Sequence, residues 1–171
     1  FFRQKTSYEL LRSLVGSEMC IRDRAPTAWP DSTDGIKRTL GRALQNASLA
    51  PADISAIMAA ANGSRMLDDT EARAYEEMFY ADGHAPFVTT VKGAAGESFS
   101  GGGIRACALA LSMDMNYLPP VVGLLRPLTE LNFIMNESRK TTMRHAVLSG
   151  ISFGGTYACL VFSDCNTKEE L

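Results

Sequence analysis

The pair Lys92 and Glu97 is the place in this sequence where a chemical role competes best with a structural one. Lys92 follows a short segment rich in β-branched residues, and Glu97 lies a little further along in a glycine-rich stretch. A lysine at the end of a strand, beside a glycine-rich turn, is where an α/β layer often places its site, because loops carry binding and catalytic residues. The sequence therefore predicts a functional site at this pair, with a surface ion pair as the alternative.

Two other groups of residues fit a structural role better. The stretch 93–103 lacks the GxxxxGK[ST] spacing of a phosphate-binding loop, and its lysine precedes the glycines, so tight packing against a helix explains it better. Asp68, Asp69 and Glu71 fall at the start of an expected helix, where acidic side chains interact favourably with the helix dipole. We therefore predict neither a nucleotide-binding loop nor a metal cluster at these positions.

The histidines and cysteines give no metal site and no disulfide framework. His84 and His145 lie far apart in the sequence, and no second ligand stands at metal spacing from either. The four cysteines show no CxxC spacing, which favours reduced thiols in a cytosolic protein. We therefore predict a cytoplasmic location, and we interpret Cys107 and Cys159 as small buried apolar side chains.

From Ala25 onward the sequence alternates between helix-like and strand-like patterns, which is typical of an α/β layer. Helices are expected over 34–47, 69–80 and 104–113, and strands over 54–61, 86–91, 145–152 and 156–163. The third helix is nearly uncharged apart from Arg105, and a helix that is apolar all round is expected to be buried all round. A glycine-containing turn separates the last two strands.

The composition fits an ordinary soluble domain. The chain has 171 residues, of which 46% are hydrophobic and 21% are charged, and its formal net charge is −2. This charge gives no field that would attract a polyanion, so nucleic acid is not an expected partner. The longest weakly charged stretch, 106–125, contains Asp114 and two adjacent prolines, so no membrane span and no membrane partner are expected.

The two ends of the chain differ from the part between them. Residues 1–24 differ in composition and resemble translated sequencing-adaptor sequence, and the first methionine is Met19. We therefore expect a piece of a longer protein, with a non-native extension at 1–24, one domain over 25–164 and a polar tail at 165–171. The alternative for the first segment is an amphipathic helix, whose apolar face would carry Tyr8, Leu11, Leu14 and Val15.

Short motifs occur in a fixed order between about Ala25 and Asp164. They are the segment 57–63, Asp68-Asp69-Thr70-Glu71, Val91-Lys92 followed by Gly96, Leu118-Pro119-Pro120, Asn136-Glu137-Ser138-Arg139 and Ser152-Phe153-Gly154-Gly155-Thr156. In this order and spacing, the chain resembles the C-terminal half of a β-ketoacyl-ACP synthase, the condensing enzyme of fatty-acid and polyketide assembly. The resemblance implies an α/β, thiolase-like fold: a mixed sheet with a buried helix, incomplete without its N-terminal half.

The resemblance also assigns expected roles to residues near the predicted site. In active members of the family, a cysteine in the N-terminal half accepts the acyl chain, and two histidines in the C-terminal half polarise the malonyl thioester during decarboxylation. By this resemblance, Asn62 takes the place of the first histidine and Glu97 that of the second. Lys92 is retained, but the carboxylate that usually pairs with it falls at Ala106, which leaves Glu97 as the expected partner. None of the four cysteines occupies the nucleophile position.

The loss of both histidines resembles the chain-length-factor subunits, which shape the acyl tunnel beside an active ketosynthase but do not run the condensation. The resemblance therefore implies a noncatalytic partner subunit, with acyl carrier protein and a homodimer or ketosynthase heterodimer as partners and no cofactor. Phe153 matches the family's gating phenylalanine, Gly154 and Gly155 complete its loop, and Ser152 replaces the first glycine. The alternative is an active condensing or malonyl-ACP-decarboxylating acyltransferase, in which the three site positions have altered roles.

Overall fold

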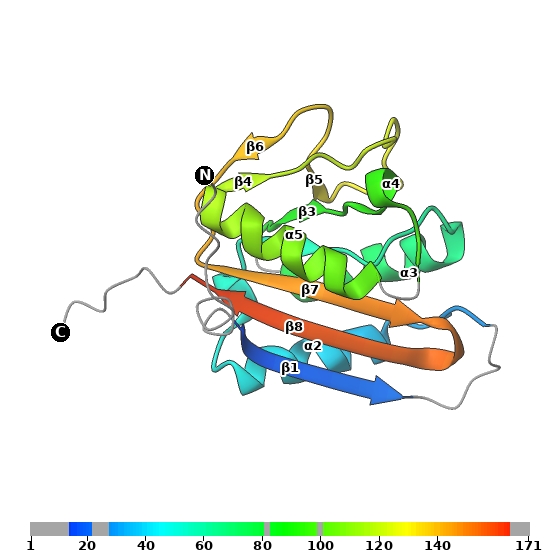
Figure 1. Cartoon of the computed structure of the whole chain (residues 1–171). Helices are drawn as coiled ribbons and strands as arrows, with labels where there is room; N and C mark the ends of the chain where they lie inside the picture. Colours follow the sequence, from blue (N-terminus) through cyan, green and yellow to red (C-terminus); the bar gives the residue numbers. More distant parts are fainter. Residues whose placement is uncertain (1–13, 22–27, 81–82, 99–100, 165–171) are drawn as a thin grey trace.

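The computed structural model describes residues 14–21, 28–80, 83–98 and 101–164, and these residues form one large sheet, one small sheet and the helices beside them (Figure 1). The strands are β1 (Leu14–Ile21), β2 (Ala56–Met58), β3 (Phe87–Thr89), β4 (Tyr117–Leu118), β5 (Asn132–Phe133), β6 (Arg139–Lys140), β7 (His145–Ser152) and β8 (Thr156–Ser163). The helices are α2 (Asp34–Asn46), α3 (Arg65–Tyr75), α4 (Lys92–Ala95) and α5 (Gly101–Met115). Short 3-10 turns cover Pro51–Asp53 and Phe153–Gly155, and a π-helical turn follows α3 at Glu76–Tyr80.

The large sheet is mixed, with the strand order β1-β8-β7-β2-β3-β5. The strands β7, β2, β3 and β5 run parallel, whereas β8 pairs antiparallel with both β7 and β1. β7 and β8 coincide with the strands predicted over 145–152 and 156–163, and they form a long hairpin. β2 and β3 are shorter than the segments 54–61 and 86–91 that were predicted for them.

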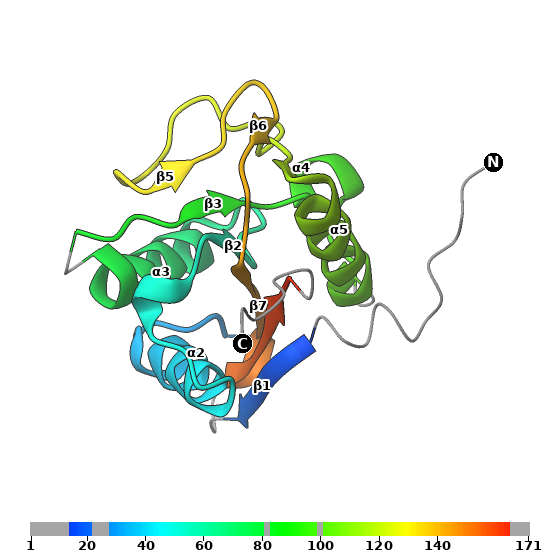
Figure 2. The ribbon, with the colours of Figure 1, turned by 90° about the vertical axis from the view of Figure 1, so that its left-hand side faces the viewer.

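The large sheet lies between two helical layers (Figure 2). On one face, Ile36 of α2 and Tyr75 of α3 share a core cluster with Val147 of β7. On the other face, Leu109 of α5 shares a second cluster with Leu148 of β7. Val147 and Leu148 are adjacent, and successive side chains of a strand point to opposite faces. One central strand therefore supplies both cores.

The helix α5 is buried on one side only. Leu109 is fully buried, whereas Ile104, Leu111 and Met115 are 53%, 58% and 65% exposed. The expectation of a helix buried all round is therefore wrong. The sheet covers one side of α5, and no described residue covers the apolar stripe that Ile104, Leu111 and Met115 form on the other side. Arg105, the charge in the predicted helix, is buried instead. Of the residues that the structure describes, none forms a helix long and apolar enough to cross a membrane.

The strand β1 places part of the first segment inside the sheet. Leu14–Ile21 pairs with β8 along nearly its whole length, and Asn46 of α2 donates a hydrogen bond from Nδ2 to the Ser17 carbonyl at 3.1 Å. Residues 14–21 therefore form a strand and not part of a helix through Leu14, because an open sheet edge pairs with a neighbour through backbone groups. The domain boundary at residue 25 stays a prediction. The non-native origin of 1–24 stays a prediction, and the tail 165–171 lies outside the described residues.

We predict that Gly16→Val lowers the free energy of unfolding by about 1–3 kcal/mol, because overpacking a close contact has a cost of this order. A Cβ atom at Gly16 would lie 2.6 Å from the Ala43 carbonyl oxygen and 2.9 Å from the Ala47 Cβ, both in or beside the last turn of α2. Urea unfolding followed by circular dichroism measures the change. Ser17→Ala, at the exposed neighbouring position, is the matched control and changes stability by less than about 0.5 kcal/mol. Equal stability of Gly16→Val and the wild type would show that β1 adds nothing to the fold.

Candidate functional site

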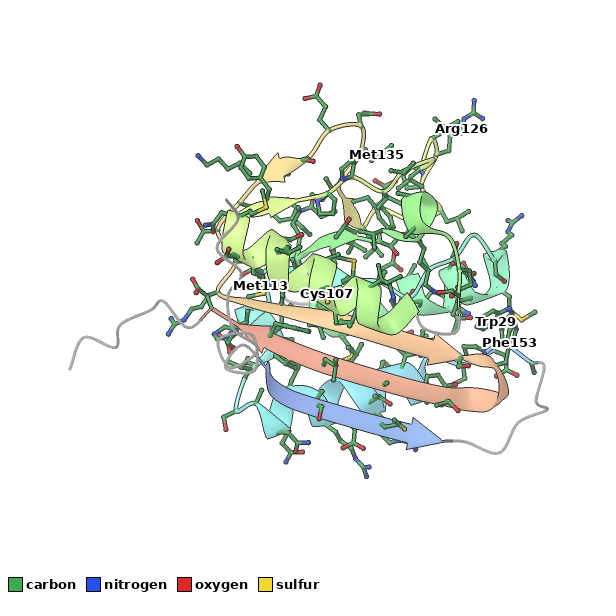
Figure 3. All side chains as sticks on the ribbon, viewed as in Figure 1. Trp29, Cys107, Met113, Arg126, Met135 and Phe153 are labelled. Atoms are coloured by element: carbon green, nitrogen blue, oxygen red, sulfur yellow. The ribbon has the colours of Figure 1, made fainter. Side chains whose placement is uncertain are left out.

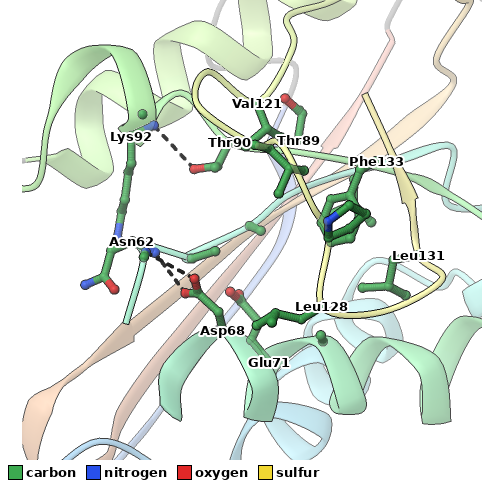
Figure 4. A pocket seen from close by; sticks show the side chains of 18 of the residues that line it. Asn62, Asp68, Glu71, Thr89, Thr90, Lys92, Val121, Leu128, Leu131 and Phe133 are labelled. Atoms are coloured by element: carbon green, nitrogen blue, oxygen red, sulfur yellow. Dashed lines mark hydrogen bonds between the residues drawn. The ribbon is translucent and has the colours of Figure 1, made fainter. Parts of the chain in front are cut away.

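Asn62, Lys92 and Glu97 come together at one edge of the large sheet. Asn62 lies in the loop after β2, and Lys92 begins α4 shortly after β3 (Figure 4). Because β2 and β3 are parallel neighbours, the loops that follow them meet at the same edge. Glu97 Oε2 accepts one hydrogen bond from Lys92 Nζ at 2.7 Å and another from Asn62 Nδ2 at 3.0 Å. The three predicted residues therefore form one connected cluster around a single carboxylate oxygen.

Two glycines allow the chain to place Glu97 beside Lys92. The short helix α4 ends at Gly96, whose φ of 78° lies in the left-handed region that glycine adopts without strain. Gly93 packs against the backbone carbonyl of Val122, so a single methyl group at this position would collide with the loop that crosses α4. Gly96 thus serves a turn and Gly93 a close approach. The expected tight packing of the helix is wrong for Gly102 and Gly103, where a Cβ atom would meet no atom within 4 Å.

Lys92 is the counter-ion of an ionised Glu97. The side chain of Lys92 is 9% exposed and that of Glu97 is 50% exposed. Partial burial raises the pKa of Glu97, but hydrogen bonds from Lys92 and Asn62, together with the charges of Lys92 and Arg105, outweigh it and hold that pKa below its ordinary value. Lys92 Nζ also donates to the Ala60 carbonyl at 2.5 Å. A largely buried cation thus links the two loops, and the carboxylate that it pairs with is half exposed.

Asp68 fixes the loop that carries Asn62. Asp68 Oδ1 accepts a hydrogen bond from the backbone N–H of Asn62 at 3.0 Å, and Oδ2 accepts one from Gly63 at 3.1 Å. Burial raises the pKa of Asp68, although these two amides and the charge of Lys92 act to lower it. Asp68 lies in the first turn of α3, as predicted, but its oxygen atoms bind the loop in front of the helix.

Glu71 is a buried carboxylate that the sequence did not single out as part of the site. It is 1% exposed, and its Oε1 accepts hydrogen bonds from the Ala60 N–H at 2.8 Å and the Tyr75 hydroxyl at 2.5 Å. Burial raises the pKa of Glu71, although both hydrogen bonds act to lower it. Asp69, by contrast, pairs with Arg73 at the surface. Within the described parts of the chain, no three metal-ligating side chains gather at one point.

Arg105 reaches the same region from the opposite face of the sheet. It is 6% exposed, and its Nη1 donates to the Ala59 carbonyl at 2.9 Å and to the Ser149 carbonyl at 2.7 Å. Burial lowers the pKa of Arg105, and the negative charge of Glu71 acts to raise it. The sequence signal that could have found this residue is its isolation as the one charge in the apolar helix predicted over 104–113, since arginine is seldom buried without partners.

A cavity of about 280 Å³ lies beside this cluster, between α3, β3 and the loop 121–131 (Figure 4). Most of its wall is apolar, and its polar end carries Asn62, Asp68 and Lys92. Glu71 lines it from α3. Small-molecule sites in proteins commonly have this form, with an apolar wall and a few convergent polar groups.

Phe153 does not line this cavity. It lies on the turn between β7 and β8, where its ring packs against Trp29 with the ring centroids 3.9 Å apart (Figure 3). The Gly154 N–H donates to the Ala28 carbonyl at 3.1 Å, and the φ angles of Gly154 and Gly155 are 75° and 79°. The segment before α2 therefore holds the turn in place.

The other candidate residues have structural surroundings. Cys159 is buried, and burial raises the pKa of its thiol to about 12, so the thiol stays protonated near neutral pH. Cys107 is exposed on α5, which corrects the expectation that it is buried (Figure 3). His84 bonds to a backbone carbonyl and His145 to a serine hydroxyl, and neither lines the cavity.

Comparison with known proteins gives consistent matches. The family description "Beta-ketoacyl synthase, C-terminal domain" matches residues 12–125. The chain is 32% identical over 124 residues to 3-oxoacyl-[acyl-carrier-protein] synthase 2 of Mycobacterium bovis. The matched region covers 71% of this chain and 29% of that protein. It is 32% identical over 162 residues to the tetracenomycin polyketide synthase ketoacyl synthase beta subunit of Streptomyces glaucescens, covering 93% and 38% of the two chains. The chain thus spans well under half the length of these relatives.

A solved structure gives the same result for the fold. The structure described as "The ishigamide ketosynthase/chain length factor" superposes with a TM-score of 0.80 and 25% sequence identity, covering 88% of this chain and 37% of that one. The fold implied by the resemblance, a thiolase-like α/β arrangement around a mixed sheet, is confirmed by this match and by the strand order described above.

We predict that Arg105→Leu lowers the free energy of unfolding by about 3 kcal/mol, because two buried carbonyl groups lose their charged donor. Equilibrium urea unfolding measures the loss. Arg42→Leu, at an exposed position of α2, is the matched control and changes stability by less than about 0.5 kcal/mol. Similar losses for the two variants would contradict the role assigned to the Arg105 guanidinium.

We also predict that Glu97 titrates below the ordinary range for glutamate in a carbon-13 NMR titration of its carboxyl group. Lys92→Met raises this midpoint, because Lys92 supplies the first of the interactions that lower it. A folded-state pKa below the unfolded value means that Glu97 stabilises the fold at neutral pH and loses that contribution as the pH falls through the folded pKa. Lys140→Met, at an exposed position of β6, leaves the midpoint unchanged. A Glu97 midpoint at or above the ordinary value would rule out the proposed ion pair.

Proposed function

The chain belongs to the β-ketoacyl synthase family of fatty-acid and polyketide biosynthesis, and we propose that it acts as part of a noncatalytic, chain-length-factor-like subunit. In this proposal it is the C-terminal domain of a longer protein, since it spans 29% and 38% of the length of two relatives. Its partners are an acyl carrier protein with its acyl or malonyl thioester and a ketosynthase subunit. The complex works in the cytoplasm.

The observation that carries this proposal is the pair of hydrogen bonds that converge on Glu97 Oε2. A condensing site must aim hydrogen-bond donors at the enolate oxygen that forms as carbon dioxide leaves. Here Asn62 and Lys92 each direct a donor to the carboxylate. Glu97 itself is ionised and has only acceptor atoms, so it cannot donate to an enolate.

The negative charge of Glu97 also disfavours catalysis of decarboxylation at this site. An ionised carboxylate beside the reacting atoms repels a developing enolate, and its half-exposed position and the neighbouring Lys92 reduce that repulsion without removing it. The missing donor is therefore the larger part of the expected catalytic defect. Removing one preorganised donor of this type from an enzyme slows it by roughly a hundredfold or more.

The test is release of carbon dioxide from saturating malonyl-ACP by the full-length protein that carries this chain. We predict slow turnover for the wild type and a rise of about a hundredfold for Glu97→His, which removes the charge and adds a donor. Glu97→Gln is the matched control, because it removes the charge without adding an imidazole, and its rise is smaller.

Two results would favour the alternative of an active enzyme. One is wild-type turnover equal to that of a ketosynthase that has both histidines. The other is a Glu97→His variant slower than the wild type, which would make Glu97 a working catalytic residue.

A further inference from the structure

Part of one face of the large sheet has no helix on it in the described portion of the chain. α2 packs on β1 and β8 from one side, and α5 lies on the other side, against β7 (Figure 1). On the α5 side, Leu160 and Ala158 of β8 are half-buried, and Met19 of β1, which pairs with Ala158, is 65% exposed. These three share that side because Leu160 packs against the α5 cluster and the side chains of a strand alternate. β8 and β1 therefore present an apolar face beside α5 that no described helix covers.

The side of α5 that points away from the sheet is also apolar. Ile104, Leu111 and Met115 are more than half exposed, and Cys107 lies exposed at the same helical spacing. α5 is described throughout, and among its exposed residues Asp114 alone carries a charge. A helix side that stays in water usually carries several charges, whereas the core of a protein interface is depleted of them. The outward side of α5 thus has the composition of an interface.

The two uncovered surfaces match in size. A helix of 15 residues, such as α5, is roughly 22 Å long and 10 Å wide. β8 and β1 have 8 residues each, so together they are roughly 26 Å long and 10 Å wide. The uncovered face of these two strands therefore has room for one helix of the length of α5, next to the α5 that is already there.

We propose that a second copy of this chain covers both surfaces at once, in a dimer with two-fold symmetry. The outward side of each α5 lies on the β8–β1 face of the other copy, so that two helices lie side by side between two sheets. Two-fold symmetry makes this contact twice, because each copy carries both surfaces. The dimer does not depend on the proposed function, since Asn62, Lys92 and Glu97 belong to none of α5, β8 and β1.

The area of the two contacts predicts a weak dimer. Together they give each copy a footprint of roughly 450 Å², from the helix dimensions above. A stable interface buries about 800 Å² of accessible surface on each partner, and smaller interfaces belong to complexes that dissociate readily. We therefore expect a dissociation constant on the order of 10 µM, so that monomer and dimer exchange on dilution.

The test is sedimentation equilibrium of the 171-residue chain from about 1 µM to 1 mM, which spans the dissociation constants of weak complexes. The average mass rises with concentration from that of one copy toward that of two. A mass of one copy throughout would overturn the proposal and would leave the remaining chain of a longer protein as the cover of these surfaces. Growth beyond two copies would also overturn it, because a two-fold contact closes at two.

Two variants locate the contact. Leu111→Glu on α5 and Met19→Glu on β1 each weaken the dimer tenfold or more, because each puts two charges into apolar surroundings. Leu125→Glu is the matched control, since Leu125 is 85% exposed on the loop 121–131, outside both surfaces, and its dissociation constant equals that of the wild type. An unchanged dissociation constant for Leu111→Glu or Met19→Glu would place the contact elsewhere and overturn the proposal. Circular dichroism checks that each variant folds.

A measurement on the wild type decides the question if a variant does not fold. Cys107 is exposed on α5, and the dimer covers its thiol. Alkylation is followed by mass spectrometry of the peptide that contains Cys107. The fraction of Cys107 that reacts in a fixed time falls as the dimer fraction rises, and dilution restores it. Equal reaction of Cys107 in monomer and dimer would overturn the proposal.

Discussion

The structure of the site depends on one guanidinium group that stands where two strands part. The backbone pairing of β2 with β7 ends at Met58 and Leu148, and the carbonyl groups of the next residues, Ala59 and Ser149, both accept hydrogen bonds from Arg105. A buried cation is tolerated only with several partners, and these two carbonyls, together with the nearby Glu71 carboxylate, supply them. Arg105 therefore ties the start of the loop after β2 to β7, which continues to Ser152.

The segment after β2 is held, one peptide group after another, by charged side chains from different elements. Arg105 binds the Ala59 carbonyl, Glu71 the Ala60 N–H and Lys92 the Ala60 carbonyl. Asp68 then binds the N–H of Asn62. The buried backbone groups of Ala59 and Ala60 are thus paired although this segment is not part of a ladder, which lets the start of an irregular loop remain buried. The position of Asn62 beside Glu97 follows from this arrangement.

The parts of the fold that could be predicted from the sequence are those set by local pattern. β7 and β8 have apolar residues and a glycine turn between them, and the Lys92–Glu97 contact joins two residues of one short segment. The contacts of Arg105 with Ala59 and of Glu71 with Ala60 could not be predicted, because their partners are backbone atoms brought near only by the sheet. Backbone atoms leave no trace in residue types. The β1 strand could not be predicted for the same reason, since it joins the sheet through its main chain.

The pairing of β1 with β8 has a consequence for how this domain accepts changes to its sequence. β8 offers a row of backbone donors and acceptors at the edge of the sheet, and an extended peptide can satisfy them with little regard to its own side chains. The one close packing requirement described for this strand is a residue without a side chain where Gly16 meets the last turn of α2. The edge is therefore a position where strand exchange, circular permutation or complementation by a separate peptide is structurally permitted.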